Sequence, residues 1–432
     1  MTERATRVRW LIVAALFAVY VLMFIDRVNI SVAGKYIMAE YGLTSVQMGT
    51  IFSMFVLGYA LFQIPGGWLG DRFGPRRVLV LAILWWSVFT AVTAFAANSF
   101  LTSILGVAGA LGLARLLIGV GEAAAPPNGA RMIANWTPPG ERGLAFGLTF
   151  SGNMLGAAIA PPLIVWLMVT WGWREAFYVA GAAGAVVAAL WLWLSADAPD
   201  LHPRVNQAER DLIGHTVGTV AMATNREPLR NVLLSGRLWC LTAAYAAAGY
   251  VLYVYFSWFY LYLTDARGVS LAEAGFYTMA PFAAAGIGAP LGGKLSDALG
   301  GRLGKPVGRA VVAVGGMIGS ALCIVAGATV ASIPLAVLLL ALGGGLLYAT
   351  MPSFWSASVD ISIARAGFAS GVMSMGGNLG GVLSPTLTPL LAREFSWAVA
   401  LYVAAAVATL GALFWIGAVP RAGGKHDSGG QD

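Results

Sequence analysis

Four ionised side chains lie inside long apolar stretches of the 432-residue chain, namely Asp26, Arg27, Arg115 and Glu122. A charge at the centre of a bilayer costs at least about 2.5–3.5 kcal/mol on insertion scales, so such residues are expected inside a helix bundle or beside a cavity. Arg115 and Glu122 are seven residues apart, nearly two helical turns, and should share one helix face. Two acids and two guanidinium groups can therefore form one self-neutralising cluster.

These residue types favour the transport of an anion together with protons. A guanidinium group can hold a carboxylate through two parallel hydrogen bonds, so Arg27 is predicted to bind the substrate. Carboxylates in apolar surroundings are easily protonated, so Asp26 and Glu122 are predicted to accept the coupled proton while Arg115 biases their protonation. Importing an anion against an inside-negative potential costs about 2.3 kcal/mol per charge per 100 mV, which a co-transported proton cancels. The alternative is a static ion-pair cluster, although a neutral interface would join two helices at lower cost.

The composition indicates which elements position this cluster. The chain is 59% hydrophobic and 10% charged, whereas soluble domains carry about 25% charged residues. Apolar stretches of roughly 20 residues, the length of a spanning helix, alternate with short polar connectors. We therefore predict an all-α integral membrane protein with twelve transmembrane helices. The predicted spans are residues 10–33, 46–69, 78–97, 100–125, 143–168, 175–195, 237–263, 273–297, 309–329, 332–356, 366–391 and 396–418.

The longest polar stretch, Ala196–Gly236, divides the predicted helices into two halves of six. The predicted domains are an N-terminal six-helix bundle at 1–195, a central loop at 196–236, a C-terminal six-helix bundle at 237–420 and a tail at 421–432. Connectors on the side of the central loop carry most of the Lys and Arg residues. The positive-inside rule therefore predicts cytoplasmic termini in a multi-pass bacterial inner-membrane protein. This placement of the basic residues also argues against nucleic-acid binding, despite the net charge of +7.

An internal repeat supports two related halves. The connector after the second predicted span begins with Gly66-Gly67 and continues to Asp71 and a basic cluster. The corresponding connector of the second half begins with Gly292-Gly293 and continues to Asp297 and further basic residues. Duplicated helical halves with a binding site between them are an established plan of transporters.

Two segments resemble the major facilitator superfamily. Gly67–Arg77 resembles its signature loop, and Arg115–Glu122 resembles its fourth-helix motif. Asp26–Ser31 and Gln63–Gly67 are similar, more narrowly, to the anion:cation symporters, which include galactonate, glucarate and hexuronate importers. The resemblance implies the major facilitator fold, alternating access, and proton-coupled import of a small organic anion, foremost a sugar acid. It also implies that the first and fourth helices face a central cavity, and that the Arg, Asp and Glu identified above bind substrate and protons.

Further side chains are predicted to line the cavity. Tyr59 and Gln63 are four residues apart and should lie on one helix face. Asn153, Trp355, Ser374 and Asn378 are the other candidates for substrate binding, and Tyr253 and Trp258 are further candidates for the cavity lining. The sugar-acid transporters carry Gln at the position of Asn153, which leaves recognition of hydroxyl groups open. For each of these residues, packing or an interfacial location is an equally valid interpretation.

Gating is predicted for Asp71, Gly67 and Asp297. In the superfamily the Asp of the signature loop pairs with an adjoining helix end and stabilises the outward-open state. The alternative interpretation of this connector is that its charges only set the membrane topology.

Several other functions remain open from the sequence. The same fold could import an aromatic acid such as phthalate or a dicarboxylate such as tartrate, or it could export drugs, although two cavity arginines favour an anion. Sodium coupling, uniport and a passive channel are further alternatives. No histidine lies in an apolar stretch, so we expect no membrane-embedded enzyme such as an acyl or glycosyl transferase, no metal and no cofactor. The expected partners are a small organic anion, a proton and the lipid bilayer, and the expected state is a monomer.

Overall fold

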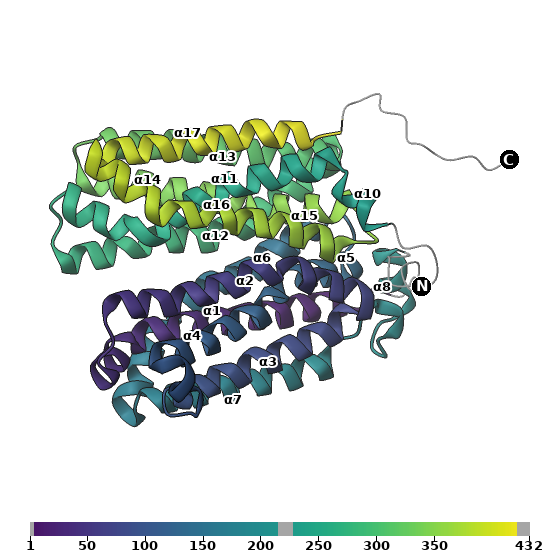
Figure 1. Cartoon of the computed structure of the whole chain (residues 1–432). Coiled ribbons are helices and arrows are strands. Elements are labelled where there is room, and N and C mark those ends of the chain that lie inside the picture. The colour runs from purple at the N-terminus through teal and green to yellow at the C-terminus, as the bar shows by residue number, and fades with distance from the viewer. Residues whose placement is uncertain (1–3, 215–227, 421–432) are drawn as a thin grey trace.

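The computed structural model of the protein describes residues 4–214 and 228–420 (Figure 1). Residues 215–227 of the predicted central loop and the predicted tail at 421–432 lie outside the described residues. Within the described ranges every regular element is a helix. Ten helical segments there are long and apolar enough to cross a membrane, and α12 and α16, of 33 and 29 residues, run beside them.

The first half contains seven helices. They are α1 (Val8–Tyr41), α2 (Ser45–Phe73), α3 (Pro75–Ala96), α4 (Leu101–Ala123), α5 (Ala125–Trp136), α6 (Arg142–Trp171) and α7 (Trp173–Leu194). Thr44 caps α2 in a capping box with Gln47, so both side chains satisfy backbone N–H groups at the start of this helix. Gly74, with φ of 92°, ends α2, and Pro75 begins α3 directly afterwards.

The second half repeats this arrangement. It contains α11 (Gly236–Leu261) with the π-helical turn η2 (Tyr262–Ala266), α12 (Leu271–Leu303), α13 (Lys305–Thr329), α14 (Ile333–Ala349), α15 (Met351–Ile361), α16 (Ala366–Glu394) and α17 (Trp397–Ala418). Gly304, with φ of 83°, separates α12 from α13 at the position that corresponds to Gly74. The short elements between the halves are η1 (Pro199–Leu201), α8 (Gln207–Ile213) and α10 (Leu229–Leu233).

The fourth and tenth predicted spans are each two helices in line. Pro126 and Pro127 lie in the first turn of α5, and Pro352 lies in the first turn of α15, where a missing N–H group leaves no helical bond unmade. The prediction ended the fourth span at residue 125, but the helix continues through buried residues to Trp136. These prolines therefore lie within two long helical segments without ending them.

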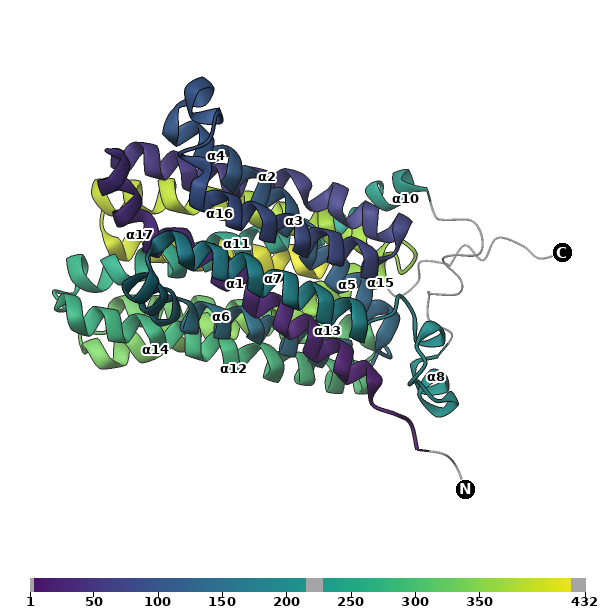
Figure 2. The ribbon, with the colours of Figure 1, turned by 90° about the horizontal axis from the view of Figure 1, so that it is seen from below.

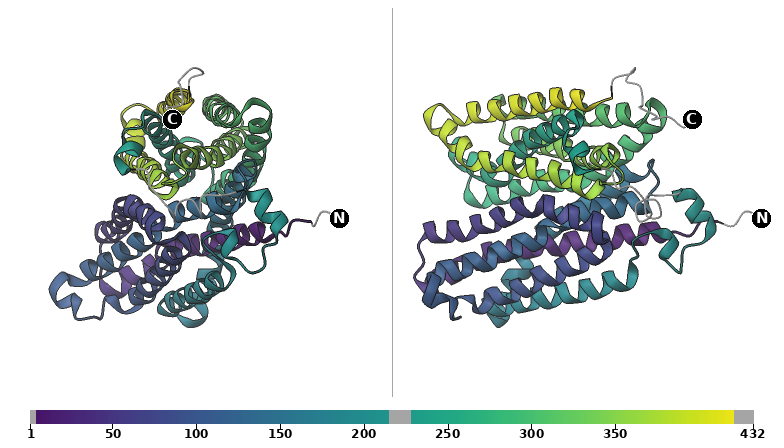
Figure 3. Two further views of the ribbon diagram at one scale, coloured as in Figure 1. Left: turned by 90° about the vertical axis from the view of Figure 1, so that its right-hand side faces the viewer. Right: turned by 45° about the vertical axis from the view of Figure 1, so that its right-hand side comes forward.

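The halves form two bundles that lie side by side (Figures 1 and 3). Within the first, α1 packs on α6, α2 on α4 and α3 on α7; within the second, α11 packs on α16 and α17, and α12 and α13 pack on α14. Between the bundles, α6 contacts α12 and α15, and α16 contacts α2 and α5. We propose that these bundles are the domains predicted at 1–195 and 237–420.

The two bundles are closest at one end of the molecule. Figure 1 shows them meeting near α5, α6 and α15, at the end where the N-terminus, α8 and α10 lie, and spreading apart toward the opposite end. Figure 2 shows the same end, with α8 and α10 beyond the helix ends. We call the first the closed end and the second the open end.

Candidate functional site

A cavity of about 130 Å³ lies between the two bundles. Six of the seven residues predicted to bind substrate line it. These are Arg27 on α1, Tyr59 on α2, Asn153 on α6, Trp355 on α15, and Ser374 and Asn378 on α16. Both halves of the chain therefore contribute predicted ligands to the same space.

Arg27 is the cation of the cavity wall. Its side chain is 23% exposed, and it donates from Nε to Glu122 Oε2 at 2.7 Å. Its guanidinium carbon lies 4.3 Å from the centre of the Tyr59 ring, and the rings of Phe24 and Phe55 flank it at 5.2 and 5.3 Å. Aromatic faces hold a guanidinium in place without using its N–H groups as donors to oxygen. Nη2 of Arg27 is buried without a hydrogen-bond partner among the described residues, and the Tyr59 hydroxyl is a further electrostatic neighbour of the guanidinium. Arg27 therefore faces the cavity with only part of its side chain.

Glu122 lies behind Arg27 and is fully buried. Its second oxygen, Oε1, has no hydrogen-bond partner among the described residues. A buried carboxylate with a free oxygen is an expensive group unless a charge or a proton satisfies it. Glu122 therefore depends on Arg27, a residue that also faces the cavity.

Asp26 and Arg115 form the inner part of the cluster. Asp26 is 2% exposed and Arg115 is 3% exposed, and neither lines the cavity. The charged neighbours of Asp26 are Glu122 and Arg115, and the indole of Trp86 faces it, yet neither Asp26 oxygen has a hydrogen-bond partner in the described part of the chain. The guanidinium carbon of Arg115 lies 4.6 Å from the centre of the Phe55 ring. Adjacent positions on α1 thus separate a cavity-facing guanidinium from a buried acid.

Gln63 is the predicted ligand that does not line the cavity. It is buried one turn beyond Tyr59, where α2 packs on α16, and neither its amide oxygen nor its amide nitrogen has a partner among the described residues. Its backbone carbonyl faces Gly371 of α16. Its role in binding stays a prediction, and the structure places it between the cavity and the closed end.

The opposite wall is polar and aromatic. Asn378 donates from Nδ2 to the backbone oxygen of Ser374 at 2.9 Å, which fixes its side chain along α16. Trp355 donates from Nε1 to the hydroxyl oxygen of Tyr245 at 3.0 Å. The side-chain amide of Asn153 faces the hydroxyl group of Tyr348, and Asn153 Oδ1 has no hydrogen-bond partner in the described residues. Amide and hydroxyl groups of this kind can bind the hydroxyl groups of a polar ligand.

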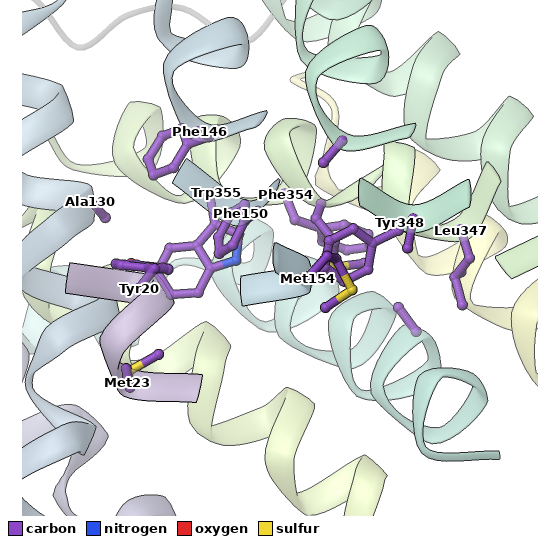
Figure 4. Packing of buried hydrophobic residues seen from close by; sticks show 14 of the residues in the cluster. Tyr20, Met23, Ala130, Phe146, Phe150, Met154, Leu347, Tyr348, Phe354 and Trp355 are labelled. Carbon is purple, nitrogen blue, oxygen red and sulfur yellow. The ribbon is translucent and has the colours of Figure 1, made fainter. Parts of the chain in front are cut away.

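An aromatic cluster forms the floor of the cavity on the side of the closed end (Figure 4). The ring of Phe150 packs against Tyr20 at 5.9 Å and against Trp355 at 5.5 Å. Phe146, one turn nearer the closed end, packs against Trp355 at 6.2 Å. These rings come from both bundles and separate the cavity from the closed end.

Three tyrosines of the cavity were absent from the predicted lining: Tyr20, Tyr245 and Tyr348. Tyr20 precedes Arg27 by seven residues, so helical spacing alone could have placed both on one face. The other two lie in α11 and α14, where apolar residues surround them in the sequence and no charge marks their faces. Tyr253 lines the cavity, whereas Trp258, the other aromatic candidate of α11, lines a separate pocket.

Two aspartates join the bundles at the closed end. Asp71, at the end of α2, accepts from the backbone N–H groups of Gly367 and Phe368 at 3.1 and 2.8 Å, in the first turn of α16. Asp297, near the end of α12, accepts from Gly143 and Leu144 at 2.9 and 2.8 Å, in the first turn of α6. A carboxylate at a helix N-terminus is stabilised by the unpaired N–H groups and the helix dipole.

The glycines beside these aspartates allow the contact. A methyl group on Gly67 would collide with the carbonyl oxygen of Gly367, and one on Gly293 would collide with that of Gly143. Arg131 adds an ion pair with Asp71 at 3.5 Å, and it donates to the backbone oxygen of Ile363 at 2.7 Å. The three residues predicted to gate, Asp71, Gly67 and Asp297, therefore all lie at the interface of the bundles, and their gating role stays a prediction.

The part of the chain that the structure describes contains no group of three or more His, Cys, Asp or Glu residues arranged to hold a metal ion. The expected absence of a metal and a cofactor stays a prediction. The polar chemistry of the cavity instead comes from one guanidinium, the amides and the hydroxyl groups described above.

The sequence matches the family profile of the Major Facilitator Superfamily over residues 16–307 and 298–432. It is 36% identical to the probable sulfoacetate transporter of Cupriavidus necator, over 95% of this chain and 94% of the relative. It is 34% identical to the D-galactonate transporter of Escherichia coli, over 96% and 97% of the two chains, and 30% identical to the hexuronate transporter of Bacillus subtilis, over 89% and 88%.

Two solved structures have the same fold. The proton:xylose symporter XylE, bound to 6-bromo-6-deoxy-D-glucose, superposes with a TM-score of 0.75 at 16% identity, covering 95% of this chain and 96% of that chain. The transporter FucP in the outward conformation superposes with a TM-score of 0.69 at 14% identity, covering 96% and 100%. At these identities the two structures establish the fold alone.

Proposed function

The chain belongs to the major facilitator superfamily, among its transporters of organic anions, and on that premise we propose that it imports a small organic anion together with protons. It is a multi-pass membrane transporter and not an enzyme. The proposed substrate is a sugar acid of the aldonate, hexuronate or glucarate type. The hydroxyl and amide groups of Asn153, Tyr348 and Asn378 support a hydroxylated ligand, and relatives named for galactonate and hexuronate transport support the same class.

The observation that carries the proposal is the bond between Arg27 and Glu122. Arg27 faces the cavity, while Glu122 is buried and offers one oxygen to its Nε. When Glu122 is ionised it competes with an incoming carboxylate for the guanidinium. When Glu122 takes up a proton, its hydrogen bond with Arg27 weakens, because an ionised acceptor bonds a guanidinium more strongly than a neutral one. Anion binding at Arg27 and proton binding at Glu122 are therefore coupled through one hydrogen bond.

Asp26 and Arg115 complete the proposed coupling. With all four groups ionised the cluster carries no net charge, so each proton that it gains leaves one positive charge for the substrate to neutralise. Arg115 is a charged neighbour of both acids, so the bound anion, the two acids and the two guanidinium groups form one electrostatic unit. Asp26 is the second proposed proton site, since it has no bonding partner among the described residues.

We propose that the closed end faces the cytoplasm, so that the structure corresponds to an outward-facing state. The Arg and Lys residues gathered at that end support this orientation. Asp71 and Asp297 would stabilise the outward-facing state until substrate and proton are bound. Breaking their four hydrogen bonds to backbone N–H groups would then open the cavity to the cytoplasm. One chain supplies both walls of the cavity, which supports a monomer as the functional unit.

The test is uptake by proteoliposomes with an inward pH gradient. The panel should contain galactonate, glucuronate and glucarate, a tartrate and phthalate pair, and sulfoacetate. Accumulation of galactonate, glucuronate or glucarate that collapses with a protonophore supports the proposal. Accumulation driven only by a sodium gradient would refute proton coupling. Transport confined to phthalate, tartrate or sulfoacetate would refute the sugar-acid class.

A further inference from the structure

A second cavity, of about 80 Å³, lies at the closed end between the bundles. The loop between α5 and α6 contributes Pro139 and Gly140, and the ends of α12 and α13 contribute the rest. Its cationic residues are Lys305 and Arg309, and Gly300 and Gly301 leave one wall without side chains. It is far from Arg27 along the helices. Asp297, which the proposed gate uses, also lines it, and both oxygens of this carboxylate are engaged by backbone N–H groups of α6.

Arg309 is an incompletely satisfied cation in this wall. The residue is 4% exposed, donates from Nη1 to the backbone oxygen of Ser356 at 3.0 Å, and pairs with Asp360. Its Nη2 is buried with no hydrogen-bond partner among the described residues. A buried donor without an acceptor costs free energy, and an anion would supply the acceptor.

The charges around the cavity leave an excess of one positive charge. Lys305 has Arg142 and Arg309 as charged neighbours and takes part in none of the ion pairs of the described chain. Asp360 is shared between Arg142 and Arg309, and Asp297 is bound to the first turn of α6. Glu141, a further acidic neighbour of Asp297, is paired with Arg9, so these two charges cancel. Lys305, Arg142 and Arg309 are thus balanced by Asp360 and Asp297, and both of those carboxylates are already engaged.

In the first half of the chain, a carboxylate occupies the N-terminus of the helix that corresponds to α13. Asp197, just after α7, accepts from the backbone N–H of Arg76 in the first turn of α3 at 2.8 Å and lies against Gly74. The corresponding helix of the second half, α13, begins at Lys305 after Gly304, and no side chain caps it in the described part of the chain. The N-terminus of α3 thus binds a carboxylate of the protein itself, whereas the N-terminus of α13 lies beside a cavity with two cationic side chains.

We propose that this cavity binds a phosphate group, with Lys305, Arg309 and the first turn of α13 as its ligands. Phosphate suits the site because it offers several acceptor oxygens to a helix N-terminus and two cationic side chains. The group belongs either to an anionic phospholipid, since basic pockets between membrane helices bind such headgroups, or to free phosphate. Because Gly140 comes from the other bundle, the bound group would stabilise the closed end.

The experiment is thermal unfolding of the full-length purified protein with increasing inorganic phosphate at constant ionic strength. Lys305→Gln removes the free cation, and Gly301→Leu fills the cavity at a helical position where a side chain meets nothing within 4 Å. Arg302→Gln is the matched control. It removes a positive charge at the end of α12, three residues from Lys305, and Arg302 does not line the cavity. We expect phosphate to raise the unfolding midpoints of the wild type and of Arg302→Gln. This increase should exceed the increase in Lys305→Gln and in Gly301→Leu by about 3 °C.

The source is distinguished in nanodiscs of phosphatidylcholine with or without phosphatidylglycerol. If phosphatidylglycerol raises the midpoint and abolishes the response to free phosphate, the ligand is the lipid headgroup; if only free phosphate acts, it is the ion. The proposal is overturned if all four proteins respond equally to both additions, or if Arg302→Gln loses as much as Lys305→Gln. None of these results depends on transport, so they stand apart from the outcome of the uptake assay.

Discussion

Arg27 and Glu122 are joined by a 2.7 Å hydrogen bond that crosses from the cavity wall into the buried interior. The guanidinium is reachable from the cavity, and the carboxylate is fully buried. A ligand that binds the first residue must therefore alter the electrostatic environment of the second. The effect of a bound anion on Glu122 therefore needs no conformational change. Substitution of Arg27 and substitution of Glu122 are expected to have different, separately measurable effects.

Replacing Arg27 with Lys should weaken anion binding by about tenfold to a hundredfold, because an ammonium cannot make two parallel bonds to a carboxylate. The charge that balances Glu122 is retained, so the protein should still fold. Binding is measured by calorimetry on the purified protein with the best substrate of the uptake panel. Wild-type affinity in this variant would show that the guanidinium does not hold the anion.

Asp26→Asn and Glu122→Gln should separate transport from proton coupling. Each keeps the shape of the side chain but cannot take up a proton, so accumulation against a gradient should fall at least tenfold. Exchange of labelled for unlabelled substrate across the membrane should persist, because exchange needs no net proton movement. Undiminished proton-driven accumulation in both variants would remove these residues from the coupling mechanism.

Asn153→Ala should reduce the affinity for a hydroxylated acid by about tenfold, the effect of losing one or two hydrogen bonds. A carboxylate of the same length without hydroxyl groups should lose little. Competition of the two acids for uptake gives both affinities in one assay. Equal losses for the two acids would indicate that Asn153 only packs against its neighbours.

The sequence predicted that four charges lie inside the helix bundle, but not which of them faces the cavity. The cost of placing a charge in lipid confines Asp26, Arg27, Arg115 and Glu122 to a bundle interior or a cavity, and the structure places them there. Which of Asp26 and Arg27 faces the cavity is set by the rotation of α1 against α4 and α6, which no local pattern fixes. Gln63 shares a helix face with Tyr59 as predicted, but that face passes from the cavity into the contact with α16 within one turn.

Asp71→Asn and Asp297→Asn should each lower the transport rate several-fold while changing substrate affinity little. An amide accepts fewer and weaker bonds from a helix N-terminus than a carboxylate, so the closed end should open more readily. Spin-label distances across that end should lengthen, and more in the double variant than in either single one. Unchanged distances in the double variant would mean that the aspartates do not hold the bundles together.

Gly67→Ala should have a similar effect by a different cause. The added methyl group meets the backbone of Gly367, which cannot move without parting the two bundles. Gly49→Ala is the control, because its added methyl group meets nothing within 4 Å. Gly67→Ala should insert normally but show longer distances across the closed end and slower uptake than the control. Identical behaviour of the two variants would contradict the role of this close approach.

The contacts at the closed end illustrate what the sequence could not supply. The repeat placed Asp71 and Asp297 at equivalent points, but their partners are 296 and 154 residues away in the chain. Those partners are backbone N–H groups, which carry no signature in the residue type. Likewise, Tyr245 and Tyr348 lie in helices of nearly uniform hydrophobicity, so only the packing of α11 and α14 around the cavity reveals their face.

Proton uptake during anion binding is the sharpest test of the link between Arg27 and the buried acids. Purified protein in weakly buffered solution with a pH indicator is mixed with saturating substrate at pH 7. We predict that the wild type takes up protons as the anion binds, and that the double variant Asp26→Asn, Glu122→Gln binds without doing so. Binding by the wild type with no change in pH would contradict the proposed coupling.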